Sequence, residues 1–121
     1  MKAAIISLGS TSSKWTFDAM KRYFKDVDEI DLHNVEVDLG AKLPLVLYNG
    51  KPLPKYDCIY LKGSFRYIQI LCSIAYVLEN NCFMPIRPET FTIGHDKLLT
   101  HLKLQKHNIP MPETYISSNP S

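Results

Sequence analysis

The sequence KAAIISLGSTSS, residues 2–13, decides the fold class of this chain. Lys2 to Leu8 is an almost continuous apolar run, which is typical of a strand covered on both faces in a parallel sheet. Gly9 to Ser13 is a short loop of glycine and hydroxyl residues, and a helix is predicted after it over 14–24. The apolar face of that helix is predicted to consist of Trp15, Ala19, Met20, Tyr23 and Phe24. Strand, small-residue loop and helix in this order open a βαβ unit.

The rest of the chain continues the same alternation. Further strands are predicted near 27–32, 57–61 and 83–84, and further helices near 65–79 and 95–107. Residues 34–54 contain short β runs and the tight-turn pair Asn49-Gly50, so they are predicted to form a small antiparallel insert near 35–53 at the edge of the sheet. The whole pattern predicts one domain over 1–121, an α/β fold with three layers and a mostly parallel, Rossmann-like sheet.

Composition limits the class of protein. The 121 residues are 45% hydrophobic and 21% charged with a net charge of +2, which fits one ordinary globular domain and gives no basic stripe for nucleic acid. Three cysteines form no C-x-x-C pair, so we expect reduced thiols and a cytoplasmic location. No signal peptide and no transmembrane stretch is found in the sequence, so no membrane partner is expected.

Residues 94–115 read GHDKLLTHLKLQKHNIPMPETY and carry clear helix boundaries. Asp96 precedes an apolar stripe and is predicted to accept amide protons of the first turn as an N-cap. Lys103 and Lys106 lie in the last turn, where positive charge is favoured. Asn108 stands where a left-handed terminating residue is needed, and Pro110 prevents continuation, so an extended piece or strand is predicted beyond it.

The same stretch, D-K-L-L-T-x-x-x-L-x-K-x-x-I-P-x-P-x-T from Asp96 to Thr114, resembles the junction in RimK-like ATP-grasp ligases, where the N-terminal (pre-ATP-grasp) domain meets the nucleotide-binding domain. The opening AIISLGS, the stretch from Tyr48 to Asp57 and the L-K-G-S loop extend the similarity along the chain. Lys62 departs from the family, which usually carries an arginine at the matching place.

Two loops are candidate substrate or phosphate sites, because both follow predicted strands at the carboxyl edge of the sheet. The first offers Ser10, Thr11 and Ser12, and its alternative interpretation is a capped helix start. The second offers Lys62, Gly63 and Ser64, and its alternative interpretation is a glycine turn with Lys62 and Arg66 reaching solvent. No catalytic residue is assigned.

No metal site is predicted. Histidines 95, 101 and 107 are six residues apart, which scatters them around a helix, and His33 stands alone in a turn. The acidic cluster of the second strand is interpreted as a solvated edge, since strand alternation divides its members between two faces; its members are Asp26, Asp28, Glu29 and Asp31.

The resemblance implies the N-terminal domain of an ATP-dependent carboxylate–amine ligase of the glutamate-ligase type, catalytically incomplete alone. In the complete enzyme, Lys97 would contact an ATP phosphate, with ATP and magnesium as cofactors; none is expected for this chain alone. Implied partners are the absent ATP-grasp domain, a small-molecule or peptide carboxylate, and an amino acid such as glutamate. Residues 110–121 would begin the link to that domain.

The alternative is a stand-alone Rossmann-like binding or oligomerisation module. The helix over 65–79 is apolar nearly all round, so we expect a homo-oligomer through it.

Overall fold

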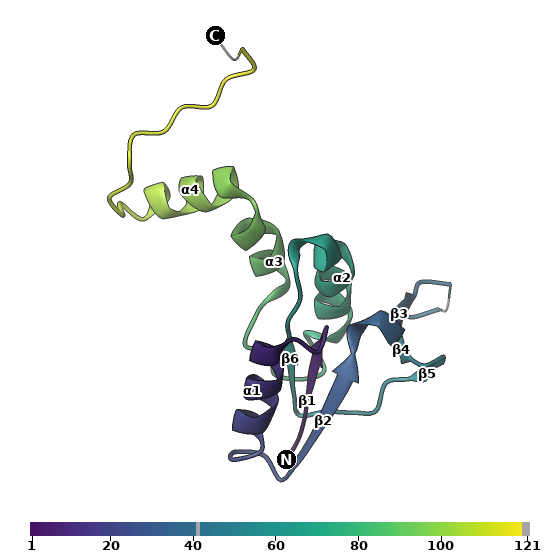
Figure 1. The fold of residues 1–121 in the computed structure, drawn as a ribbon. Coiled ribbons are helices and arrows are strands. Elements are labelled where there is room, and N and C mark those ends of the chain that lie inside the picture. Colours follow the sequence, from purple (N-terminus) through teal and green to yellow (C-terminus); the bar gives the residue numbers. More distant parts are fainter. Residues whose placement is uncertain (41, 120–121) are drawn as a thin grey trace.

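The computed structural model describes residues 1–40 and 42–119. Its centre is a parallel sheet of three strands, β1 (Lys2–Ser7), β2 (Asp26–Asp31) and β6 (Cys58–Leu61), in the order β2-β1-β6 (Figure 1). The three strands confirm the predicted positions of the first three buried runs. The predicted strand at 83–84 is reduced to one parallel bridge between Phe83 and Cys58.

The excursion after β2 forms a second, separate sheet. A 3-10 turn (Leu32–Asn34) leads into β3 (Val35–Asp38), which pairs antiparallel with β4 (Leu45–Tyr48), and β4 pairs with β5 (Lys51–Pro52). Asn49 and Gly50 join β4 to β5 with positive φ angles of 51° and 76°, the backbone of a type I′ hairpin turn. The antiparallel insert is therefore confirmed, although it is a sheet of its own and not an edge of the parallel sheet.

Helix α1 (Thr11–Met20) begins three residues before the predicted position. Ser10 is its N-cap, with its Oγ accepting from the amide of Ser13 at 3.2 Å, so the serines were part of the helix start. The predicted apolar face was partly wrong: Trp15 is 70% exposed and Tyr23 81% exposed, whereas Met20 and Phe24 are half-buried as predicted. The face turned inward recurs instead at helical spacing, with Ser13 buried and the others half-buried: Ser13, Thr16, Phe17, Met20 and Phe24.

The main core lies between the sheet and α2 (Ile68–Leu78), which follows a 3-10 turn (Phe65–Tyr67). Leu71, Ile74 and Ala75 of α2 are buried in one cluster with Ala4 and Ile6 of β1. Because strand side chains alternate, Ser7 and the other odd-numbered residues of β1 face the opposite side of the sheet, and there they are buried as well.

The apolar surplus of α2 is covered within the chain, since the helix also packs against α3, β3 and β4. Ile70 and Leu78, which were expected to need an outside cover, are half-buried in the core cluster. That surplus therefore no longer argues for a partner subunit, and the homo-oligomer stays a prediction.

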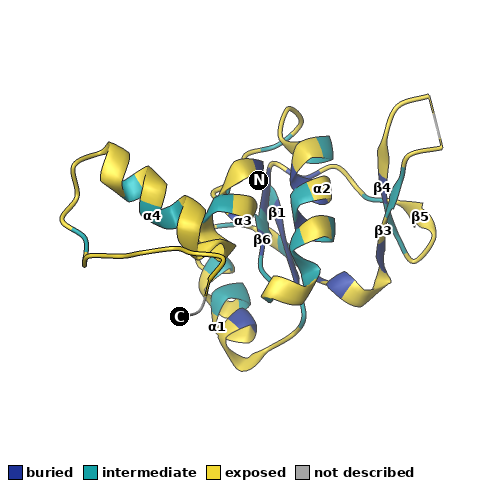
Figure 2. Ribbon diagram, turned by 90° about the horizontal axis from the view of Figure 1, so that it is seen from above, coloured by how far each residue is buried: buried dark blue, intermediate teal, exposed yellow. Residues whose placement is uncertain are grey.

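The predicted helix 95–107 corresponds to α4 (Lys97–Lys106), and its boundary signals are confirmed. Asp96 caps it, with Oδ1 accepting from the Leu99 amide at 2.9 Å, and Asn108 has a φ of +57°. No helix was predicted between residues 84 and 95, but α3 (Pro88–His95) forms there; proline suits the first turn of a helix, where no amide partner is needed. No strand follows α4 among residues 109–119. Helix α4 and the segment after it project from the body of the domain and stay largely exposed (Figures 1 and 2).

Candidate functional site

The two candidate loops meet at the carboxyl edge of the parallel sheet. The Lys62 amide donates to the Ile6 carbonyl at 2.9 Å, which places Lys62 directly after β6 and beside the end of β1. Its Nζ donates to Ser12 Oγ in the first turn of α1. A cation from one loop and a hydroxyl from the other are therefore in contact, as expected for two loops that follow parallel strands. A role of these residues in binding stays a prediction.

The hydroxyls of the first loop have two roles. Ser10 Oγ lies 2.8 Å from Ser13 Oγ and 3.3 Å from Ser12 Oγ, so the cap is a small network of hydroxyl groups. This supports the alternative interpretation, a capped helix start. The remaining first-turn amides still point out of the helix at the positive end of its dipole, beside Lys62, where an anion is favoured. Thr11 is exposed and forms the first residue of the helix.

Gly63 has a role in packing. A Cβ at this position would lie 2.7 Å from Leu71 Cδ1 and 3.4 Å from Leu32 Cδ2. Gly9 is different, because its φ is +74° and no atom lies within 4 Å of an added Cβ. The backbone at Gly9 is therefore open to space, whereas Gly63 lets α2 pack close to the sheet. Ser64 precedes the 3-10 turn without a side-chain capping bond.

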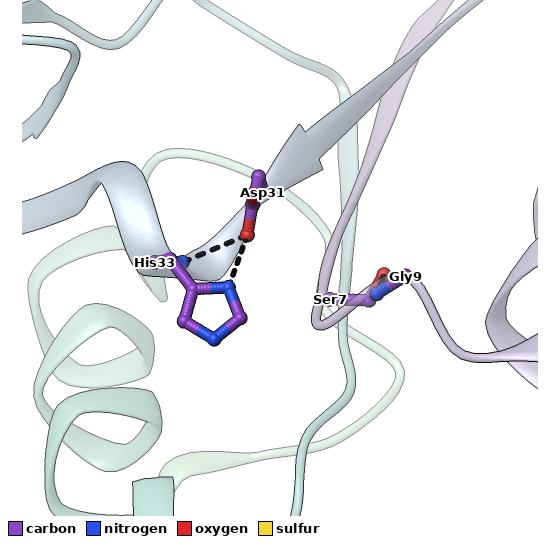
Figure 3. Close-up of polar contacts among 4 residues, drawn as sticks. All are labelled: Ser7, Gly9, Asp31 and His33. Carbon is purple, nitrogen blue, oxygen red and sulfur yellow. Dashed lines mark hydrogen bonds and ion pairs between the residues drawn. The ribbon is translucent and has the colours of Figure 1, made fainter.

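A pair that the sequence reasoning missed lies at the end of β2. Asp31 Oδ1 accepts from the His33 amide at 3.0 Å and lies 2.7 Å from His33 Nδ1 (Figure 3). The backbone hydrogen bond from His33, followed by the one from its ring, lowers the pKa of Asp31 below its usual value. The His33 ring also meets the Tyr67 ring edge-on, with centroids 5.7 Å apart. His33 therefore does not stand alone. The sequence feature that could have indicated this pair is the D-x-H spacing of Asp31 and His33 at the end of a predicted strand.

A hollow of about 250 Å³ opens beside this pair at the ends of β1 and β2. Ser7, Gly9, Glu29, Asp31 and Tyr48 contribute to its lining. Ser7 is 1% exposed and accepts from the Gly9 amide at 3.2 Å, so it adds a fixed polar group to the lining.

The other members of the acidic cluster do not join this site. Asp28 accepts from the Tyr56 hydroxyl at 2.7 Å and lies 3.7 Å from Lys2 Nζ, which gives it a structural role. Desolvation, followed by the hydrogen bond to Asp28, raises the pKa of Tyr56. Among residues 1–40 and 42–119, no three His, Cys, Asp or Glu side chains gather as metal ligands.

Lys97 lies apart from these loops. It opens α4 and lines a groove of about 1140 Å³ between that helix and the segment from Ile109 to Ile116, to which none of the loop residues contributes. Much of the groove is apolar, with Leu98, Leu102 and Ile109 among its lining residues, and no residue of α4 is buried.

Comparison with known proteins gives a partial match to a relative. No family model matches the chain. Over 61 residues, 49% of the chain, it is 38% identical to a protein of Marinomonas sp. (strain MWYL1) described as a "Probable alpha-L-glutamate ligase". The chain spans about a fifth of the length of that relative. This partial match supports a relationship with RimK-like ligases. In the part of the chain that the structure describes, no helix has both the length and the apolar character needed to cross a membrane.

Proposed function

We propose that this chain is the N-terminal domain of an ATP-dependent carboxylate–amine ligase of the glutamate-ligase type. The observation that carries the proposal is the 38% identity over 61 residues to a relative described as a glutamate ligase. The parallel order β2-β1-β6, with a helix after β1 and another after β6, supports a Rossmann-like layering in which substrates bind at the carboxyl edge.

At that edge, Lys62 and Ser12 supply the chemistry for an anionic substrate. A lysine ammonium offers three donors as a compact charge, and the serine hydroxyl beside it can donate one more. A carboxylate bound there would also lie at the positive end of α1. The chain thus contributes substrate binding and positioning to the complete enzyme, and it is catalytically incomplete alone.

The fit of the implied cofactors differs between metal and nucleotide. Magnesium prefers several oxygen ligands, and among the described residues no three His, Cys, Asp or Glu side chains gather, so these residues do not fit a magnesium ion. For ATP, Lys97 is an exposed cation at the amino end of α4, where a phosphate is electrostatically favoured. We propose that Lys97 contacts a phosphate of ATP once the nucleotide-binding domain is in place.

That domain is the proposed partner of α4. Leu98, Leu99 and Leu102 are 43%, 37% and 50% exposed, which is unusual for three leucines of one short helix. The same exposed face supports the alternative function, a stand-alone module that oligomerises. Sedimentation of this chain distinguishes the two functions. Self-association through α4 is required by the stand-alone module. A monomer favours the proposal, in which α4 packs against the nucleotide-binding domain of the complete enzyme.

The proposed function is tested by enzyme activity. The protein of which this chain is the proposed N-terminal part should form ADP and phosphate when given ATP, magnesium, a carboxylate acceptor and L-glutamate. Lys62→Gln should raise the KM for the anionic substrate about ten-fold, because a charge-assisted hydrogen bond is lost. Lys14→Gln, an exposed lysine of the same helix start, is the matched control. Absence of amino-acid-dependent ATP consumption would overturn the proposal.

A further inference from the structure

The hollow of about 250 Å³ beside Asp31 is built by the ends of three strands. Ser7 and Asp31 are register partners at the last positions of β1 and β2, and Glu29 lies two residues earlier on β2. Gly9 lines the hollow from the turn after β1, and Tyr48 lines it from the last position of β4. The lining therefore combines two carboxylates and two hydroxyl groups with the backbone of a glycine turn.

The carboxylates of the hollow keep unused acceptor atoms. Oδ1 of Asp31 accepts both hydrogen bonds from His33, whereas its Oδ2 and both carboxylate oxygens of Glu29 bond to no described residue (Figure 3). The pKa of Asp31 is held below its usual value by the same bonds from His33, so the group is ionised at neutral pH and only accepts hydrogen bonds. His33 thus fixes the orientation of a carboxylate that can still accept a hydrogen bond from a ligand.

The two hydroxyl groups of the lining can supply donors. The buried Ser7 Oγ accepts from the Gly9 amide at 3.2 Å, and no described residue accepts the hydrogen of Ser7 itself. The Tyr48 hydroxyl forms no hydrogen bond with a described residue, so it can both donate and accept. Acceptors and donors therefore lie around one small space, which suits a ligand group that also does both, such as a hydroxyl.

Charge and size limit what can enter the hollow. No lysine, arginine or histidine is among the described lining residues, so the two carboxylates would repel a phosphate or carboxylate group. A cation offers no acceptor to the hydrogens of Ser7 and Tyr48, whereas a hydroxyl group does. The volume is also below the roughly 300–1,000 Å³ of pockets that enclose a drug-sized ligand, so the hollow takes one small group and the rest of the ligand stays outside.

The position of the hollow in the sheet favours the sugar of a nucleoside. Ligands of open α/β sheets bind outside the carboxyl ends of the strands, and in dinucleotide-binding sheets an Asp or Glu about 20 residues after the first glycine turn bonds to the ribose 2′-hydroxyl. Asp31 follows Gly9 at about this separation, and Gly9 has a φ of +74° in the turn after β1. Residues 9–13 lack the further glycines of the dinucleotide fingerprint, so the comparison extends to the diol and not to a pyrophosphate.

From this arrangement we infer that the hollow binds the vicinal diol of a ribose, with Asp31 and Glu29 accepting from its two hydroxyl groups and the hydroxyls of Ser7 and Tyr48 donating to them. The site is distinct from the groove that Lys97 lines, and the inference does not depend on the proposed function. A nucleoside is the favoured source of the diol, and a free sugar with the same ring is the other source.

The test is a titration of the 121-residue chain, followed by the shifts of its backbone amide NMR signals. Uridine should shift the signals of Ser7, Gly9 and Asp31, which line the hollow. 2′-Deoxyuridine lacks one hydroxyl of the diol and should bind about ten-fold more weakly, because a charge-assisted hydrogen bond is lost. Methyl β-D-ribofuranoside carries the diol without a base: weaker binding than uridine identifies a nucleoside as the source, and equal binding identifies the sugar alone.

Two variants separate binding from folding. Glu29→Ala removes an exposed carboxylate that bonds to no described residue, so the thermal midpoint should change little while the affinity for uridine falls about ten-fold. Asp31→Asn keeps a good N-cap for the turn and should weaken uridine to a similar degree, because the charge on the acceptor is lost. Asp26→Ala is the matched control, since Asp26 is an exposed carboxylate of the same strand outside the lining, and it should leave the affinity unchanged.

Equal binding of uridine and 2′-deoxyuridine would overturn the inference, and so would the same affinity for uridine in Glu29→Ala and Asp26→Ala. Absence of any shift at tens of millimolar uridine would overturn it as well. If n-butylammonium shifts the same signals and uridine does not, the hollow is a site for cations and the diol is excluded.

Discussion

Gly63→Ala is the sharpest test of how the site is built, because the structure isolates one steric contact. The backbone of Gly63 does not have a positive φ, so alanine causes no conformational strain there. Its Cβ would, however, lie 2.7 Å from Leu71 Cδ1, well inside van der Waals contact. Leu71 is 0% exposed and surrounded by the core, so it cannot move away freely.

The expected cost follows from overpacking of a closed core. Inserting one methyl group into such a place destabilises by about 1–3 kcal/mol, and at about 4–8 °C per kcal/mol the thermal midpoint should fall by roughly 5–20 °C. Gly94→Ala is the matched control, since nothing lies within 4 Å of its added Cβ and it sits in α3. That substitution should stabilise by about 0.4–1 kcal/mol.

Urea unfolding followed by circular dichroism measures both variants, and a double-mutant cycle with Leu71→Ala identifies the contact. Leu71→Ala alone should cost about 2–5 kcal/mol. In the Gly63→Ala background it should cost less by about 0.5–3 kcal/mol, because the new methyl group occupies part of the space that Leu71 leaves. Unchanged stability of Gly63→Ala, or strict additivity of the two changes, would refute the reasoning.

Three further predictions test other features. In the complete enzyme of the proposed function, Lys97→Ala should lower kcat/KM about ten-fold or more, because the proposed phosphate contact is lost. Lys103→Ala in the same helix should not lower it, and equal effects would remove Lys97 from the proposed site. Trp15→Ala should change the free energy of unfolding by less than about 0.5 kcal/mol, whereas Phe17→Ala should lower it by about 1–2 kcal/mol. A larger loss for Trp15→Ala than for Phe17→Ala in urea unfolding would contradict the observed inward face of α1. The pKa of Asp31 is lower in the folded state than in the unfolded state, where it is near 3.8. Its contribution to stability is therefore present above the unfolded pKa and is lost as the pH falls through the folded pKa. Asp31→Asn should remove this pH dependence from acid unfolding curves.

The sequence predicted the parallel strands and the meeting of the two loops because both depend on regular, local rules. A continuous apolar run such as residues 2–8 is typical of a central strand buried on both faces of a sheet. Loops that follow parallel strands lie at the same edge of the sheet. The Asp96 cap and the Asn49-Gly50 turn were equally accessible, since each is fixed by residues within four positions of it.

What the sequence did not predict depends on contacts between distant residues. The face of α1 was misassigned because Trp15 and Tyr23 are large and apolar, whereas burial is decided by where the helix begins and how it meets β1 and β2. Helix α3 was missed because Pro85 and Pro88 suggested a link, although a proline in the first turn is compatible with a helix. The cover of α2 by α3 could not be anticipated without that helix.

The two polar pairs at the carboxyl edge show why the sequence indicated Lys62 and not Asp31 as a candidate residue. Lys62 was predicted as a candidate because its loop offers a cation, a glycine and a hydroxyl directly after a buried strand. Asp31 belonged to a run of alternating acidic residues, and alternation by itself predicts a solvated edge. What distinguishes Asp31 is that its strand ends there, so that it caps the next turn and holds the His33 ring, while Asp28 is tied to Tyr56. At the end of this parallel strand, an ordinary surface carboxylate therefore acquires a fixed partner, His33.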